Sequence, residues 1–71
     1  MTGFMLDMVA RLTGATVKQL IHWDRTGLIR PSIAQAHGKG SRRVYSFLDV
    51  IAVKTAVTLR REGISLQKIR R

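Results

Sequence analysis

Cysteine is absent from this 71-residue chain, which excludes disulfide bonds and thiolate metal sites. Two histidines and four acidic residues make a poor set of metal ligands, so we expect neither a metal nor any other cofactor. The apolar runs are far too short to span a membrane, and no basic region precedes the first of them, as one would in a secretion signal. We therefore predict a cytoplasmic protein.

Acidic residues are scarce, and their scarcity leaves the chain strongly cationic. Thirteen Lys and Arg stand against four Asp and Glu, which gives a formal net charge of +9. A small domain with this charge repels itself unless an anion is part of its working environment. Nucleic acid is the first candidate and an anionic membrane the second. Charge that serves only solubility is the alternative, although such charge is normally of both signs.

Patterns typical of enzymes are also missing. We find no nucleophile beside a base, no pair of catalytic carboxylates and no phosphate-binding loop, and we predict that the protein is not an enzyme. Residues 1–71 suffice for one small domain. Hydrophobic residues make up 45% of them, which is enough apolar material for a compact core.

Two short helices with a turn between them are predicted near the N-terminus. Apolar residues recur at helical spacing in residues 4–12, and a glycine in the following turn suits a tight connection. Thr16 and Gln19 fit a capping box at the start of a second helix over residues 16–26, and Gly27 lies just past its end. These are the proportions of a helix-turn-helix.

A hairpin and a longer helix follow. We predict that residues 28–33 and 42–45 form the arms of a small hairpin with a glycine-rich tip. Ser46 opens a second capping box and a helix over residues 47–62, and a last segment, residues 65–71, begins another helix. The predicted fold is therefore mainly α with a small β-hairpin, a winged helix-turn-helix.

The 47–62 helix is richer in apolar residues than one buried face requires. This surplus indicates either a helix covered on two sides by its neighbours, which is the interpretation we favour, or a second contact surface. The apolar residues fall into a stripe and a neighbouring group of valines. The stripe is Leu48, Ile51, Ala52 and Leu59, and the valines are Val50, Val53 and Val57.

The 16–26 helix carries polar side chains on one side. Lys18, His22 and Arg25 are neighbours on the helical period, with Gln19 alongside, and the start of the helix at Thr16 offers unpaired amides. The major groove of B-DNA accepts one helix, and such side chains can read base edges or grip phosphates. An ordinary solvated helix face is the alternative for this set taken alone.

The hairpin strengthens the interpretation that the protein binds DNA. A capped helix with a polar face followed by a basic hairpin is much rarer by chance than either feature alone. Arg42 and Arg43 are consecutive, so in a strand they point to opposite faces. One can reach DNA while the other braces against the first helices or takes another phosphate. Lys39, Ser41 and Tyr45 add further donors, and a basic, glycine-rich tip suits a wing on a phosphate backbone. A disordered basic loop is the alternative.

From about Phe4 to Arg71, the sequence resembles the DNA-binding domain of the MerR family of bacterial transcription regulators. The segments that carry the resemblance are VARLTGATVKQLIHWDRTGLIRPS, RRVYSFLDV and LRREGISLQKIRR. The positions that match the family pattern are Ala10, Thr13, Gly14, Leu20, Trp23, Gly27, Leu28, Arg43, Tyr45, Asp49, Gly63, Ser65, Leu66 and Ile69.

The resemblance implies a winged helix-turn-helix that binds double-stranded DNA in the nucleoid and regulates transcription. The 16–26 helix would enter the major groove, and the wing arginines would grip the flanking backbone. Ile21 stands where the family pattern has arginine, and His22 where it has tyrosine. The missing arginine would shift DNA affinity towards Lys18, Arg25 and the wing.

Members of the family usually bind near-palindromic promoter sites as dimers, so we expect a homodimer in the full-length protein or on DNA. They dimerise through a long C-terminal helix and sense ligands in a domain beyond it. This chain is then either part of a longer regulator or a short member without a sensor domain. Neither an effector nor the direction of regulation follows from its residues.

Two other functions stay open at this stage. An excisionase-like architectural protein shares the small winged fold and bends DNA for recombination. A basic module could instead dock on an anionic membrane, or on a protein through the valine side of the 47–62 helix.

Overall fold

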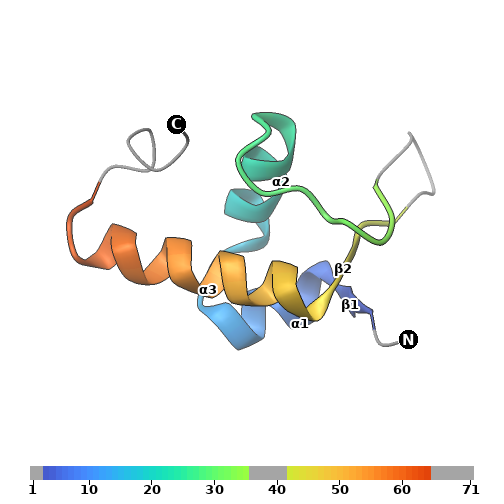
Figure 1. Ribbon diagram of the computed structural model, residues 1–71, viewed down its shortest axis with the longest axis horizontal. Coiled ribbons are helices and arrows are strands. Elements are labelled where there is room, and N and C mark those ends of the chain that lie inside the picture. The colour runs from blue at the N-terminus through green and yellow to red at the C-terminus, as the bar shows by residue number, and fades with distance from the viewer. Residues whose placement is uncertain (1–2, 36–41, 65–71) are drawn as a thin grey trace.

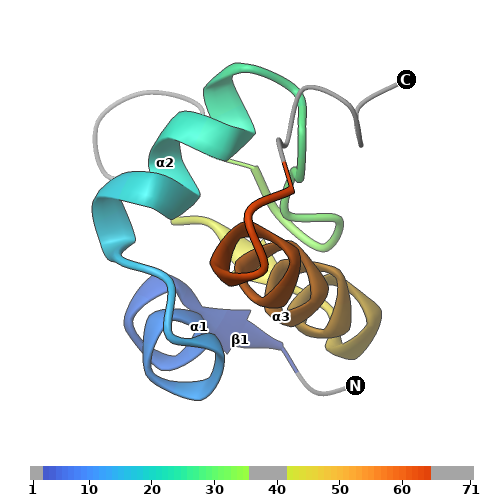
Figure 2. The same ribbon diagram turned by 90° about the vertical axis from the view of Figure 1, so that its left-hand side faces the viewer.

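A computed structural model of the chain describes residues 3–35 and 42–64. Within these residues, three helices and two short strands follow the order β1 (Phe4–Met5), α1 (Leu6–Thr13), α2 (Val17–Arg25), β2 (Val44–Tyr45) and α3 (Phe47–Arg61). α1 and α3 lie side by side, and α2 crosses above α3 (Figures 1 and 2). The fold is mainly α with a small antiparallel sheet, as predicted.

Local hydrogen bonds explain where α2 and α3 begin. The Thr16 hydroxyl accepts from the Gln19 amide at 3.0 Å, and the Gln19 side chain accepts from the Thr16 amide at 3.0 Å. Ser46 and Asp49 make the same reciprocal pair at the start of α3. Both predicted capping boxes are therefore confirmed. Each satisfies two amides that a helix end leaves without partners.

The prediction of a helix over residues 4–12 is wrong at its beginning. Phe4 and Met5 form the strand β1, which pairs antiparallel with β2 in the register Phe4 with Tyr45 and Met5 with Val44. Gly3, just before the strand, leaves no room for a side chain, because an added Cβ would lie 2.5 Å from a methyl group of Val44. The partner strand lies far along the chain, so helical spacing in the local sequence could not indicate this pairing.

The predicted hairpin is correct in topology but wrong in extent. Val44 donates to the Ala34 carbonyl at 2.8 Å, and the Ala34 amide returns a bond of 3.1 Å. Most of the predicted arm at 28–33 lies in turns and bends instead. The amide of Leu28 bonds to the carbonyl of Trp23 at 2.9 Å, so this segment closes the end of α2 before it turns towards the wing. β2 thus has a backbone partner on each side.

The valines of α3 form its buried face. Val50, Val53 and Val57 belong to the core, whereas Leu48 is 75% exposed and Ile51 is 46% exposed. Our preferred interpretation, that neighbours cover α3 on two sides, is therefore wrong for the residues that the structure describes. The proposed docking of a protein through the valine side is also excluded, because α1 and β2 pack against α3 and the three valines belong to the buried core. The buried apolar residues are Val9, Ala15, Leu20, Trp23, Tyr45, Val50, Val53, Ala56 and Val57.

None of the helices in the described ranges combines the length and the apolar composition that a bilayer crossing requires.

Asp49 fastens the segment after α2 to the start of α3. Its Oδ2 atom accepts hydrogen bonds from the Ser32 amide at 2.8 Å, from the Ser32 hydroxyl at 2.6 Å and from the Ser46 amide at 2.9 Å. Burial raises the pKa of the Asp49 carboxyl, but the hydrogen bonds from Ser32 and Ser46 outweigh it and hold the pKa below its ordinary value. The ionised carboxylate therefore stabilises the folded state.

This arrangement predicts how stability depends on pH. The unfolded chain takes up a proton on Asp49 at a higher pH than the folded chain does. The stabilisation is therefore complete above the ordinary carboxyl pKa of about 4 and is lost as the pH falls below it. Asp49→Asn should lower the free energy of unfolding by about 1–2 kcal/mol at neutral pH. Thermal unfolding followed by circular dichroism between about pH 2.5 and pH 7 measures both effects.

The variant should also show a shallower loss of stability in acid than the wild-type protein. An Asp49→Asn profile as steep as that of the wild type would contradict the role given to this carboxylate.

Candidate nucleic-acid interface

The exposed side of α2 carries the three predicted side chains. Lys18, His22 and Arg25 are all exposed, whereas the opposite side of the helix buries Leu20 and Trp23. The apolar side holds α2 against α1 and α3, and the helical period then turns the polar row outward. This basic ridge, defined as Lys18, His22 and Arg25, is therefore free to meet a partner.

Thr16 and Gln19 already serve the start of α2. Their capping box uses the Thr16 hydroxyl oxygen and the Gln19 carbonyl oxygen as acceptors. The hydroxyl proton of Thr16 and the amide NH₂ of Gln19 remain as donors. Both residues can thus hold the helix and still offer a hydrogen bond to a ligand that approaches its N-terminus.

The wing lies against α2 through one of its two arginines. Arg43 is 16% exposed, and its Nε atom donates to Oδ2 of Asp24 at 2.6 Å. Arg42 is exposed. The prediction that one arginine would brace against the first helices is confirmed, and Arg43 is that residue. Both arginines line an open cleft of about 370 Å³, together with Val17 at the start of α2, Met5, Leu6 and Asp7.

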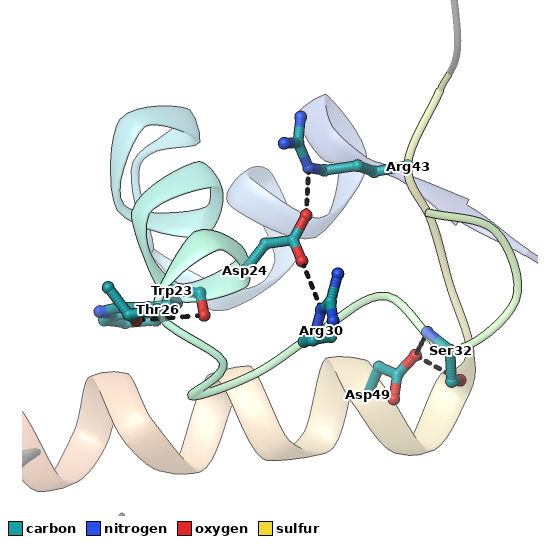
Figure 3. Close-up of polar contacts among 7 residues, drawn as sticks. All are labelled: Trp23, Asp24, Thr26, Arg30, Ser32, Arg43 and Asp49. Carbon is teal, nitrogen blue, oxygen red and sulfur yellow. Dashed lines mark hydrogen bonds and ion pairs between the residues drawn. The ribbon is translucent and has the colours of Figure 1, made fainter. Parts of the chain in front are cut away.

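Asp24 receives two arginines, one from the wing and one from the segment after α2. Its Oδ1 atom accepts from Nε of Arg30 at 3.0 Å, while its Oδ2 atom accepts from Arg43 (Figure 3). The carboxylate side chain is only 6% exposed. Burial raises the pKa of Asp24, but the hydrogen bonds and charges of Arg43 and Arg30 outweigh it and lower the pKa below its ordinary value. Asp24 is therefore an ionised anchor.

Sequence reasoning did not identify Asp24 or Arg30. The sequence did contain a signal for Asp24. Position 24 falls on the buried side of α2, next to Trp23, and it holds one of only four acidic residues. A carboxylate at a buried position is nearly always paired with a cation.

A second pair of arginines flanks α2 on the side away from the wing. Arg60 and Arg61, at the end of α3, line an open cleft of about 260 Å³ with Gln19 and Trp23. The guanidinium of Arg61 lies so near Gly14 that a Cβ added there would be 3.0 Å from its Nη2 atom. The sequence does not reveal this proximity, because only the packing of α3 against α1 and α2 produces it.

Tyr45 was predicted to contact DNA, and the structure corrects this. It is 0% exposed, and its hydroxyl is buried without a hydrogen-bond partner among the described residues. Burial raises its pKa to about 12, with the nearby charge of Asp24 as a smaller cause. Tyr45 is thus a core residue beneath the wing. Lys39 and Ser41, the other predicted wing contacts, lie outside the described residues.

The comparison with protein families matches residues 4–71 to the model described as the MerR HTH family regulatory protein. This chain belongs to the MerR family. The match covers the helix-turn-helix, the wing and α3, so the resemblance expected from the motifs is confirmed over the whole described fold.

The relatives of this MerR-family chain are regulators by name. The chain is 41% identical over 70 residues to uncharacterised HTH-type transcriptional regulators of Mycobacterium bovis and Mycobacterium tuberculosis, covering 99% of this chain and 31% of each relative. The chain thus spans less than a third of their length. Their names point to a regulator and not to an enzyme.

Solved structures show the same fold. A MerR-family transcriptional regulator from Bacillus cereus matches with a TM-score of 0.80 at 23% identity, over 97% of this chain and 49% of that one. The HTH-type transcriptional regulator SkgA from Caulobacter crescentus matches with a TM-score of 0.75 at 28% identity, over 99% and 48%. The winged helix-turn-helix is therefore confirmed.

Among the residues that the structure describes, no group of three histidine or acidic side chains is placed to hold a metal ion in this MerR-family domain.

The burial of Tyr45 predicts the effect of removing its hydroxyl. Tyr45→Phe should raise the free energy of unfolding by about 1 kcal/mol, because a buried hydroxyl without a partner loses its hydrogen bonds to water and gains none. Its affinity for DNA should equal that of the wild type. Chemical denaturation and fluorescence anisotropy with a labelled duplex measure the two quantities. A variant that folds well but binds DNA much more weakly would restore Tyr45 to the interface.

Proposed function

We propose that this domain binds double-stranded DNA of specific sequence and thereby regulates transcription, with α2 in the major groove and the basic wing on the phosphate backbone. One observation carries the proposal above the others. The exposed basic ridge of α2 lies beside the wing, and the ion pair between Arg43 and Asp24 holds the two together. A helix can enter the groove of a duplex while an adjoining basic segment contacts its phosphate backbone.

The ridge supplies the groups that can read bases. Lys18 and Arg25 carry donors that suit guanine edges or phosphates, and His22 offers ring nitrogens between them. Ile21, which replaces the arginine of the family pattern, is half-buried beside the ridge. The remaining donor of Gln19 would lie near the backbone at the start of α2, together with the hydroxyl of Thr16.

The wing supplies affinity that does not depend on sequence. The exposed Arg42 and the outer end of Arg43 would contact phosphates, and Lys39 and Ser41 would extend the contact along the backbone. On the other side of α2, Arg60 and Arg61 would contact the neighbouring strand. A net charge of +9 would draw the domain to DNA and make its affinity fall steeply with salt.

We further propose that the regulator acts as a homodimer, in the full-length protein or on DNA, as MerR-family members usually do. Two copies related by a two-fold axis would present two α2 helices to two half-sites of one near-palindromic operator. A selected site with inverted half-sites would support this arrangement.

Selection from a random pool of duplexes tests the proposed function. We expect a preferred sequence to emerge, with an affinity that falls with salt at a log–log slope of about −4 to −5, since a single domain of this size makes about four to six phosphate contacts. Anisotropy titrations at several salt concentrations give the slope. A strong salt dependence with no preferred sequence would favour an architectural role, and tight binding to anionic vesicles without duplex affinity would favour a membrane role.

Single substitutions should separate base contacts from phosphate contacts. Lys18→Ala should change which sequence is preferred and cost about 1–3 kcal/mol on the wild-type site, whereas Arg42→Ala should weaken all duplexes alike and make the salt slope less steep by about one. Lys54→Ala removes the same charge from an exposed residue of α3, which belongs to neither the ridge nor the wing, and is the matched control. Repeating the selection with each variant measures preference, and titration measures affinity.

If Lys54→Ala lowers affinity as much as the two other substitutions, net charge alone would explain binding, and the assignment of α2 to the major groove would be refuted.

A further inference from the structure

We infer that Asp24 is a positioning residue for DNA binding, and that Arg30 is a phosphate contact which Asp24 holds beside Arg43. The inference rests on the proposed function and deepens it. It adds Arg30, a residue outside both the ridge and the wing, to the surface that meets the backbone.

The hydrogen bonds leave the phosphate-binding ends of both arginines available. Arg43 and Arg30 each bond to Asp24 through Nε, at 2.6 Å and 3.0 Å. The Nη atoms of each guanidinium, with four N–H donors, make no hydrogen bond to any other residue in the described ranges. In Figure 3 the terminal nitrogens of Arg43 point away from the carboxylate. Such N–H pairs are the donors that bind phosphate oxygens in bidentate fashion.

The burial of the carboxylate explains how an acidic residue can serve in a DNA-binding surface. An exposed aspartate would repel phosphate, but the Asp24 side chain is 6% exposed and both of its oxygens are occupied. Of its two partners, the Arg30 side chain is 55% exposed and the Arg43 side chain is 16% exposed, so Arg30 is the more accessible to a ligand. The cluster contains two positive charges and one negative charge, so it keeps a net positive charge that a phosphate can neutralise.

Asp24 also fixes two long side chains before DNA arrives. Free arginine side chains lose rotamer freedom when they bind, and that loss weakens affinity. Two arginines without the carboxylate would also repel each other. The ion pairs remove both costs from the binding step, because the wing residue and the residue after α2 are already held at the same carboxylate.

The alternative is that the ion pairs of Asp24 serve only the stability of the fold. The direction in which the DNA affinity changes when Asp24 is neutralised distinguishes the two hypotheses. Asp24→Asn removes a negative charge and so raises the net charge of the domain by one. If net charge alone governs binding, the variant should bind DNA more tightly. If Asp24 positions the two arginines, the variant should bind more weakly in spite of its higher charge.

The experiment measures duplex affinity as a function of salt for the wild-type protein and four variants. We expect Asp24→Asn to bind about tenfold more weakly to selected and random duplexes alike, with the preferred sequence unchanged. Asp24→Glu keeps the carboxylate and should recover most of the loss. Arg30→Gln should weaken all duplexes and make the salt slope less steep by about one. Lys54→Gln makes the same charge change as Arg30→Gln on the exposed side of α3 and should leave a smaller effect.

Circular dichroism ensures that only folded protein is compared. Arg30→Gln, at a half-exposed side chain, tests the phosphate contact in a protein that keeps both Asp24 and Arg43. Folded Asp24→Asn that binds as tightly as the wild type, or more tightly, overturns the positioning role. An Arg30→Gln slope equal to that of the wild type overturns the phosphate contact. Wild-type protein without affinity for any duplex would refute the proposed function itself.

Discussion

A buried carboxylate between two arginines determines how the parts of this domain that face a ligand fit together. Asp24 belongs to α2, Arg43 precedes the wing strand, and Arg30 follows α2, so three segments meet at one ionised group. Removing such a charge from water is costly, and only the paired guanidinium groups offset that cost. Because Arg43 pairs with Asp24, the same interaction that permits burial of the carboxylate also holds the wing against α2.

The backbone adds a second and independent constraint on the wing. β2 is hydrogen-bonded to β1 on one side and to Ala34 on the other, and Tyr45 anchors it in the core. The strand is therefore fixed by main-chain bonds, while the arginine beside it is fixed by a side-chain ion pair. A domain of 71 residues has a small core, and these long-range ties supplement what apolar burial alone provides.

Features that depend on neighbouring residues could be predicted from the sequence. The starts of α2 and α3 follow from capping boxes, and the outward row on α2 follows from the helical period. Features that depend on distant partners could not. The strand at Phe4 forms by pairing with β2, and Arg61 lies near Gly14 because the helices pack together. In a strand of two residues, alternation does not reveal which side is buried, and Tyr45 was therefore assigned to the wrong surface.

The pairing of β1 with β2 has a practical consequence for anyone who handles this domain. The pairing is antiparallel, with Phe4 opposite Tyr45 and Met5 opposite Val44, so a polypeptide fused ahead of Gly3 would leave the domain at the end of β2 that leads into α3, opposite to the end that Arg43 precedes. A purification tag or fluorescent reporter joined there would start from the end of the strand opposite to the wing. The junction would also have to retain the glycine, because Val44 occupies the space that any larger residue needs.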